Sequence, residues 1–142
     1  MKQLLIPVLI LFLGVHTRSM SQVNENKTIP RDTTFNVKST YLKEKEKFPF
    51  IEIVEPYLPE NVRADKNVVY LTLPDSPYGK RDLHADVFYP GAPAEGPFPG
   101  VVLIHGGGWR SGDRSHLVPL AQQLAAKGYV TITVEYRLSL EA

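Results

Sequence analysis

The sequence predicts an α/β fold in which an antiparallel strand hairpin is followed by a strand–helix–strand (βαβ) unit. A strand-like segment, 68–73, and an alternating segment, 83–89, are separated by turn-forming residues and predict the hairpin. An apolar run, an amphipathic stripe and a further alternating segment follow within about 36 residues, which predicts two parallel strands joined by a helix. With 142 residues, the chain has room for one such domain at most.

The first three strands are expected from local patterning. Residues 75–80 are rich in turn formers, so we expect a long loop between the two hairpin strands. In the second strand the residues of one face are apolar: Leu83, Ala85, Val87 and Tyr89. Residues 101–104 are all apolar, which is typical of a strand buried on both faces in a parallel sheet.

A helix and a fourth strand complete the βαβ unit. The helix is predicted by apolar residues at i, i+3, i+4, i+7 and i+8: Leu117, Leu120, Ala121, Leu124 and Ala125. Ser115 is the expected N-cap, Pro119 fits the first turn, and Gly128 ends the helix. Residues 129–136 then alternate as a strand, with one row of larger apolar side chains and one row of Thr131, Thr133 and Glu135.

The N-terminus has the pattern of a signal peptide, which we expect to span residues 1–21. Lys2 supplies a positive charge, residues 4–15 form a short apolar core, and small residues flank Met20 at the expected cleavage site. This core is shorter than the roughly 20 residues needed to span a bilayer, so no membrane association is expected once the leader is removed. The chain has no cysteine, so the predicted location is the bacterial periplasm or exterior, without disulfides.

Residues 22–66 are predicted to form an extended N-terminal arm, and residues 67–142 are predicted to form a partial α/β domain. Residues 22–47 are polar and rich in mixed charges, which indicates a tether. Residues 48–57 carry several large apolar side chains between prolines, so we expect an extended strap packed on the domain surface.

The charge balance excludes one class of partner. The chain has 16 basic and 15 acidic residues, and loss of Lys2 and Arg18 with the leader brings the net charge to −1. Because no basic patch stands out, nucleic acid is not an expected partner. The sequence carries no signal for a particular oligomeric state.

Residues 105–109, His-Gly-Gly-Gly-Trp, follow the apolar strand and carry the clearest chemical signal. Adjacent glycines expose backbone N–H groups and adopt φ values that other residues avoid. A phosphate-binding loop would need a lysine where Asp113 stands. A dinucleotide loop would need a glycine where Ser111 stands. The third chemistry, an oxyanion hole, needs only N–H donors placed in advance, so it fits best.

The chain resembles the α/β-hydrolase superfamily, specifically its esterase/lipase group with a His-Gly-Gly-Gly loop. The matching residues are 105–109 before the helix, Gly128-Tyr129-Val130 at its end, and Glu135-Tyr136-Arg137-Leu138-Ser139 after the last strand. The resemblance covers about residues 67–142 and is nearest to secreted bacterial esterases that deacylate plant polysaccharides. It implies the N-terminal part of an α/β-hydrolase sheet, truncated before the nucleophile elbow.

Roles in the site follow from this resemblance. It implies that Gly106, Gly107 and Gly108 supply oxyanion-hole donors and that His105 braces the loop without acting as the triad base. For Trp109 two roles stay open, a wall of the acyl or sugar site and a cover for the sheet edge. Ion pairs that brace loops are expected from Arg110, Asp113 and Arg137.

The nucleophile is missing from the chain. The superfamily's triad follows the order Ser, Asp or Glu, His, and no Gly-x-Ser-x-Gly occurs here. No serine stands on a strand-to-helix elbow, so we do not expect Ser111 or Ser115 to form a triad with His84, Asp113 or His116. We therefore expect an inactive N-terminal fragment of a serine carboxylesterase, with no metal or organic cofactor and a small-molecule or polysaccharide ester as substrate.

Two other functions stay open. A serine peptidase of the same superfamily would carry the same loop. A non-catalytic binding module would use the short sheet as it stands, although sheet edges and one sheet face would then be uncovered.

Overall fold

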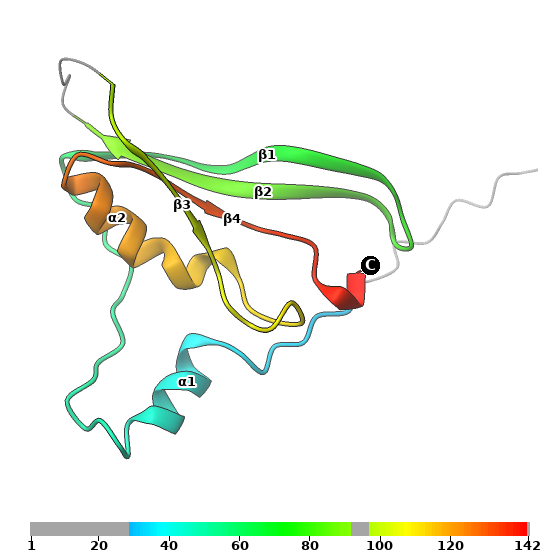
Figure 1. The fold of residues 1–142 in the computed structure, drawn as a ribbon, viewed down its shortest axis with the longest axis horizontal. Helices are drawn as coiled ribbons and strands as arrows, with labels where there is room; N and C mark the ends of the chain where they lie inside the picture. The colour runs from blue at the N-terminus through cyan, green and yellow to red at the C-terminus, as the bar shows by residue number, and fades with distance from the viewer. Residues whose placement is uncertain (1–28, 92–96, 142) are drawn as a thin grey trace, which may run out of the picture.

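The structure is a computed structural model, and it describes residues 29–91 and 97–141. Figure 1 shows the elements in chain order. They are α1 (Val37–Glu44), β1 (Val62–Ser76), β2 (Gly79–Pro90), β3 (Gly100–Ile104), the 3₁₀ turn η1 (Arg114–Leu117), α2 (Val118–Ala126), β4 (Val130–Val134) and η2 (Ser139–Glu141). The expected signal peptide lies outside the described residues. Within the described ranges no helix is long and apolar enough to cross a membrane.

The four strands form one sheet in the order β1-β2-β4-β3. β1 pairs antiparallel with β2, β2 pairs antiparallel with β4, and β3 pairs parallel with β4. The predicted hairpin and the predicted βαβ unit with parallel strands are therefore both confirmed.

The hairpin is longer and its turn tighter than expected. β1 begins at Val62, five residues before the expected start near Asn67, and Ser76 pairs directly with Gly79. The expected long loop is thus a two-residue turn, because the strands continue through residues whose composition indicated a loop. Asn67 has a φ of 57° at a register shift, so a bulge interrupts β1 where the sequence suggested its start.

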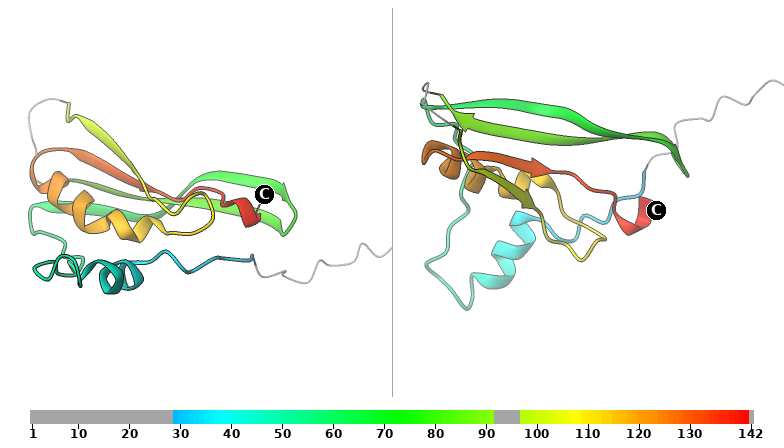
Figure 2. Two further views of the ribbon diagram at one scale, coloured as in Figure 1. Left: turned by 60° about the horizontal axis from the view of Figure 1, so that its bottom comes forward. Right: turned by 45° about the horizontal axis from the view of Figure 1, so that its top comes forward.

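The core lies between the sheet and α2 (Figure 2). Phe88 is fully buried, although the alternation placed it opposite the expected apolar face of β2. It packs with four smaller residues: Val62, Val118, Ala121 and Ala125. In β4 the polar row faces this core, with Thr131 and Thr133 fully buried and the Thr131 hydroxyl donating to the Ala121 carbonyl (2.9 Å).

Two expectations about the helix were wrong in detail. The side chain of Asp113, not Ser115, caps the turn: it accepts a hydrogen bond from the Ser115 N–H, and η1 precedes α2. The buried face of α2 is Val118, Ala121, Gln122 and Ala125, whereas Leu120 is 49% exposed. The start of α2 at Val118 places Leu120 away from the sheet, so the predicted stripe is only partly buried.

β3 corrects the expectation of a strand buried on both faces. It stands at the edge of the described sheet, and Val102 and Ile104 are 57% and 62% exposed. α2 packs on the other face of the sheet, and nothing among the described residues covers these two side chains. An apolar run reports that a strand favours burial, but the neighbouring elements decide whether burial occurs.

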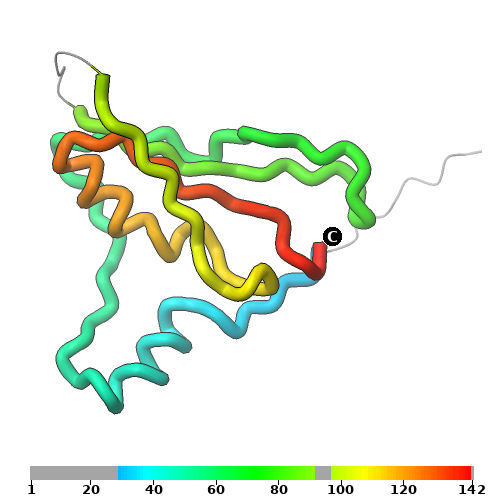
Figure 3. The backbone as a smooth tube through the Cα atoms, in the orientation of Figure 1, coloured from blue at the N-terminus to red at the C-terminus, as the bar shows by residue number. Residues whose placement is uncertain are grey.

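The N-terminal arm differs from an extended tether because it contains α1. Asn36 caps this helix by accepting from the Ser39 N–H, and the Ser39 hydroxyl accepts from the Asn36 N–H. This reciprocal capping stabilises a helix that has no buried residue. Figure 3 shows the arm running past α2 and joining β1 at the far end of that helix. There the Asn61 side chain donates to the Ala126 carbonyl (3.3 Å).

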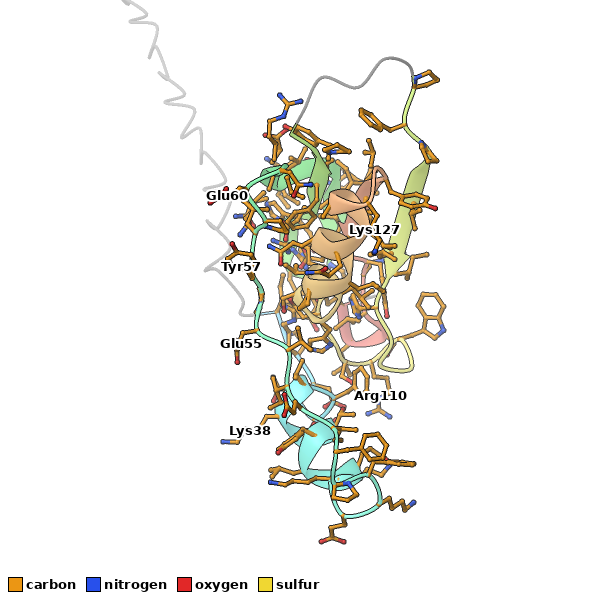
Figure 4. All side chains as sticks on the ribbon, turned by 90° about the vertical axis from the view of Figure 1, so that its left-hand side faces the viewer. Lys38, Glu55, Tyr57, Glu60, Arg110 and Lys127 are labelled. Carbon is orange, nitrogen blue, oxygen red and sulfur yellow. The ribbon has the colours of Figure 1, made fainter. Side chains whose placement is uncertain are left out.

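The strap also departs from expectation. Residues 51–58 are irregular, as the prolines predicted, but they do not pack on the domain. Phe50, Val54 and Tyr57 are 79%, 68% and 66% exposed. Figure 4 shows Glu55 and Tyr57 along the outer side of the strap. A cavity of about 1,100 Å³ separates the arm from the outer face of α2.

Candidate functional site

The candidate site is the glycine loop, residues 105–112, which connects β3 to η1. Its backbone is unusual, since Gly107, Gly108, Trp109 and Gly112 have φ values of 126°, 61°, 62° and 98°. The carbonyl of Gly107 accepts from the N–H groups of Arg110 (3.2 Å) and Ser111 (3.1 Å), which closes a tight turn. The loop therefore needs glycine for its conformation, as expected from the sequence.

Two glycines are also required by space. A methyl group on Gly107 would overlap the carbonyl oxygen of Ser111. A methyl group on Gly112 would overlap the Gly106 carbonyl oxygen and lie 2.6 Å from Nδ1 of His105. Gly108 differs, because a methyl group there would meet nothing within 4 Å. The turn is thus closely packed at Gly107 and Gly112 and open at Gly108.

The loop offers unpaired hydrogen-bond donors. None of the hydrogen bonds formed within residues 29–91 and 97–141 uses the N–H of Gly106, Gly107 or Gly108 as a donor. Gly106 and Gly108 are exposed and Gly107 is half-buried. Three consecutive N–H groups without partners are available to a negatively charged oxygen.

His105 is buried at the start of the loop, with 4% of its surface exposed. Its ring stacks on Tyr136 at 4.3 Å between centroids and 15° between planes. Its Nδ1 lies 2.8 Å from the Gly106 carbonyl oxygen, which can only accept, so Nδ1 carries the proton. The Tyr136 hydroxyl donates to the His105 carbonyl (2.9 Å), and burial raises the pKa of Tyr136. These contacts tie the segment after β4 to the loop.

We expect Tyr136→Phe to lower the free energy of unfolding by about 1 kcal/mol, because it removes one half-buried hydrogen bond and keeps the ring stacked on His105. Urea unfolding followed by the fluorescence of the single tryptophan, Trp109, measures this loss. Tyr129→Phe is the matched control, since the Tyr129 hydroxyl makes no hydrogen bond to the described residues. Equal stability of the two variants would contradict a bracing role for the Tyr136 hydroxyl.

Trp109 projects from the turn and is 66% exposed. Its ring meets Tyr136 edge-on at 5.1 Å, and its carbonyl accepts from the Ser139 N–H (2.7 Å). The indole is thus free on most of its surface while its backbone is fixed to the segment after β4.

The three residues expected to form bracing ion pairs behave differently. Asp113 lies 3.5 Å from Arg31. Burial alone would raise the pKa of Asp113, but hydrogen bonds from Ser115 and the charges of the arginines Arg31 and Arg114 lower it overall. Arg110 and Arg137 are exposed and form no ion pair with any residue that the structure describes.

Sequence reasoning missed Arg114, which joins a buried charge network beneath the site. Its guanidinium lies 3.3 Å from Asp86 and 3.6 Å from Glu135. Glu135 also pairs with Arg81 (2.7 Å) and accepts from the His84 N–H (3.1 Å). The available signal was the period-2 spacing that puts His84 and Asp86 of β2 on one sheet face.

The structure brings no catalytic triad together in the described residues. The Ser111 hydroxyl is buried and donates to the Gly107 carbonyl (3.2 Å), while Ser115 is exposed on η1. Burial is the main reason that the pKa of His116 is lowered; the charge of Asp113 opposes the shift and that of His105 adds to it. No group of three or more His, Asp or Glu residues in the described ranges is arranged to hold a metal ion.

Part of the chain is similar to known proteins. Residues 85–142 match the family model BD-FAE, and no curated protein matches the chain. Among solved structures, esterase B from Lactobacillus rhamnosis is 27% identical, with a TM-score of 0.48 over 72% of this chain and 29% of that one. A bacterial heroin esterase is 20% identical, with a TM-score of 0.45 over 78% of this chain and 32% of that one. Brefeldin A esterase, a bacterial homologue of human hormone-sensitive lipase, is 24% identical, with a TM-score of 0.44 over 72% of this chain and 27% of that one. The chain thus spans about a third or less of the length of these structures.

Proposed function

We propose that this chain, whose residues 85–142 match an esterase/lipase-type family of the α/β-hydrolase superfamily, is the N-terminal part of a carboxylesterase-type hydrolase. The observation that carries the proposal is the set of unpartnered N–H groups at Gly106, Gly107 and Gly108. They follow the carboxyl end of a strand, which is where open α/β sheets place their ligands. Small-molecule esters are the proposed substrates.

In the proposed reaction the glycine loop stabilises charge and supplies no nucleophile. A serine outside these residues attacks the ester carbonyl carbon, and its proton passes to a histidine. The carbonyl oxygen becomes an oxyanion, which the loop N–H groups hold until the C–O bond to the alcohol breaks. The alcohol then leaves with the proton from the histidine, and the acyl group stays on the serine. Water, deprotonated by the histidine, attacks this acyl-serine through a second oxyanion, and the acid leaves as the serine regains its proton. Loss of one such donor costs about 10²–10³ in rate.

His105 and Trp109 have supporting roles in this proposal. The stacking of His105 on Tyr136 and its bond to the Gly106 carbonyl support a bracing role, outside the triad. Trp109 is exposed beside the free N–H groups, which supports a role as a wall of the acyl or sugar site. The leader-like residues 1–21 support export of the protein. An exported protein would meet acylated polysaccharides outside the cell, and we propose these as a further class of substrate.

The test begins with the coding DNA beyond Ala142. We expect an in-frame continuation with Gly-x-Ser-x-Gly followed by Asp and His, and hydrolysis of p-nitrophenyl acetate by the longer protein. The 142-residue chain should not exceed a heat-treated control. Turnover by the short chain, or a continuation without a nucleophile elbow, would overturn the proposal. Cleavage of peptide substrates in preference to esters would identify a peptidase, and a stop codon after Ala142 would favour a binding module.

A further inference from the structure

The N-terminal arm makes two contacts with the glycine loop and two with the turn that follows it, although nothing in its composition suggested a role there. Phe35 lies beside Gly106, with its ring 3.7 Å from where a methyl group on that glycine would stand. The same ring meets His116 edge-on at 5.6 Å. Asp32 forms a parallel backbone bridge with Ser111, and Arg31 lies 3.5 Å from Asp113. We call residues 31–35 the arm clamp.

Few other residues of the described chain contact the glycine loop from outside. It follows β3, the edge strand of the described sheet, and its turn is held mainly by bonds within the loop. Glycine-rich backbone has many accessible conformations, so a fixed arrangement of N–H groups needs contacts from outside. Tyr136 and Ser139 provide such contacts from the segment after β4, and the arm clamp provides another from the N-terminal arm.

The aromatic contacts of the arm clamp connect directly to the predicted site. The His116 ring lies between Phe35, at 5.6 Å, and His105, at 6.4 Å, and both ring pairs are edge-to-face. His105 in turn stacks on Tyr136. A continuous row of four rings therefore runs from the arm, under the first residues of the loop, to the segment after β4.

The arm clamp is itself held in one conformation. The carboxylate of Asp32 accepts from both the N–H (2.9 Å) and the hydroxyl (2.6 Å) of Thr34, and these two bonds lower its pKa. Asn36 caps α1 immediately afterwards. Phe35 is thus fixed between a side-chain turn and a capped helix, which keeps its ring against the loop.

We propose that Phe35 is a positioning residue for the oxyanion-hole donors, and that the arm clamp is a structural part of the active site. The proposal rests on the proposed function only where it assigns the loop N–H groups the role of an oxyanion hole. Phe35 and its arm act by limiting the motion of Gly106–Gly108 and touch no substrate. The arm, which carries no catalytic group, would then be required for full esterase turnover.

The test is hydrogen exchange of the full 142-residue chain at micromolar concentration, followed by mass spectrometry. In Phe35→Ala we expect the hydrogen-bonded loop amides, those of Arg110 and Ser111, to exchange about tenfold faster, with the β1–β2 hairpin unchanged. Phe35→Tyr keeps the ring and should restore slow exchange. Phe50→Ala, an exposed aromatic of the same arm, is the matched control and should leave loop exchange unchanged.

A second measurement follows His116 by NMR titration. Asp113 and His105 are the titratable groups that act on it, and burial lowers its pKa. Removal of the Phe35 ring should expose His116 and raise its pKa towards the ordinary value. Arg31→Met removes the contact between Arg31 and Asp113 and leaves the Phe35 ring in place. We expect this variant to raise hydrogen exchange in the loop by a smaller amount, still without a change in the hairpin.

The outcomes separate this inference from the esterase proposal. Faster loop exchange in Phe35→Ala supports the arm clamp whether or not the longer protein hydrolyses esters. Unchanged loop exchange together with an unchanged His116 titration would overturn it, even if the longer protein is an esterase. Uniformly faster exchange that also includes the hairpin would overturn it as well, because Phe35 would then act on global stability.

Discussion

Gly107→Ala should lower the free energy of unfolding by at least about 3 kcal/mol and open the glycine loop. Two costs combine, because the φ of 126° is accessible almost only to glycine and the new methyl group would overlap the Ser111 carbonyl. The backbone must leave this conformation, so the bonds from Arg110 and Ser111 to the Gly107 carbonyl are lost. Urea unfolding and the emission of Trp109 measure the effect.

Gly108→Ala is the control for this prediction. Gly108 has a φ of 61°, a left-handed value that alanine tolerates at a cost of about 1 kcal/mol, and the new methyl group would meet nothing within 4 Å. We therefore expect Gly108→Ala to keep most of the native stability. If both variants lost the same stability, the close approach of Gly107 to Ser111 would not be what fixes the turn. In an active longer protein, Gly107→Ala should also reduce kcat by about 10²–10³.

Glu135→Gln should destabilise the chain by about 3 kcal/mol, because it removes the charge at the centre of the buried network. Glu135 is 5% exposed and balances two guanidinium groups, of Arg81 at 2.7 Å and Arg114 at 3.6 Å. Without that carboxylate both cations stay buried with weaker pairing. Urea unfolding gives the loss directly.

The matched control is Asp82→Asn, which removes a carboxylate from β2, the strand that also carries Arg81. Asp82 lies 3.5 Å from Lys80 on the surface, where an ion pair contributes about 1 kcal/mol or less. A loss for Glu135→Gln no larger than that of Asp82→Asn would show that the network does not stabilise the fold.

The Glu135 carboxylate also makes stability depend on pH. Burial would raise the pKa of Glu135, but the hydrogen bonds from Arg81 and His84 and the charge of Arg81 lower it below the ordinary 4.5. A pKa lowered by folding contributes stability that is complete above about 4.5 and is lost as pH falls through the folded value. Glu135→Gln should therefore flatten the decline of stability below that pH, and an unchanged acid profile would contradict this assignment.

The sheet and the glycine loop were predictable because their signals are local. Period-2 alternation identified β2 and β4, and the stripe of small and apolar residues identified α2, since these patterns follow from backbone geometry alone. The run 105–109 identified the loop, because consecutive glycines limit which conformations and which chemistries are possible. The resemblance to α/β-hydrolases rested on the same short segments, and the family match falls on the same part of the chain, residues 85–142.

Burial was less predictable, because it depends on what packs against each element. The apolar residues of β3 suggested an interior strand, yet Val102 and Ile104 are exposed at the edge of the described sheet. The alternation in β4 did not indicate which row is covered, and it is the polar row that is buried, with Thr131 and Thr133 fully buried under α2. Both strands were predicted correctly as strands, but the side that is covered is decided by the position of α2.

Contacts between segments that are distant in the chain could not be predicted from the sequence. The sequence alone established the hairpin, the βαβ unit and a loop with free N–H donors, all encoded within short stretches of chain. Only the tertiary structure placed Phe35 beside Gly106 and Glu135 between Arg81 and Arg114, across separations of 71, 54 and 21 residues. Such pairs leave no periodic signal, because their proximity results from how the arm, the hairpin and α2 pack together.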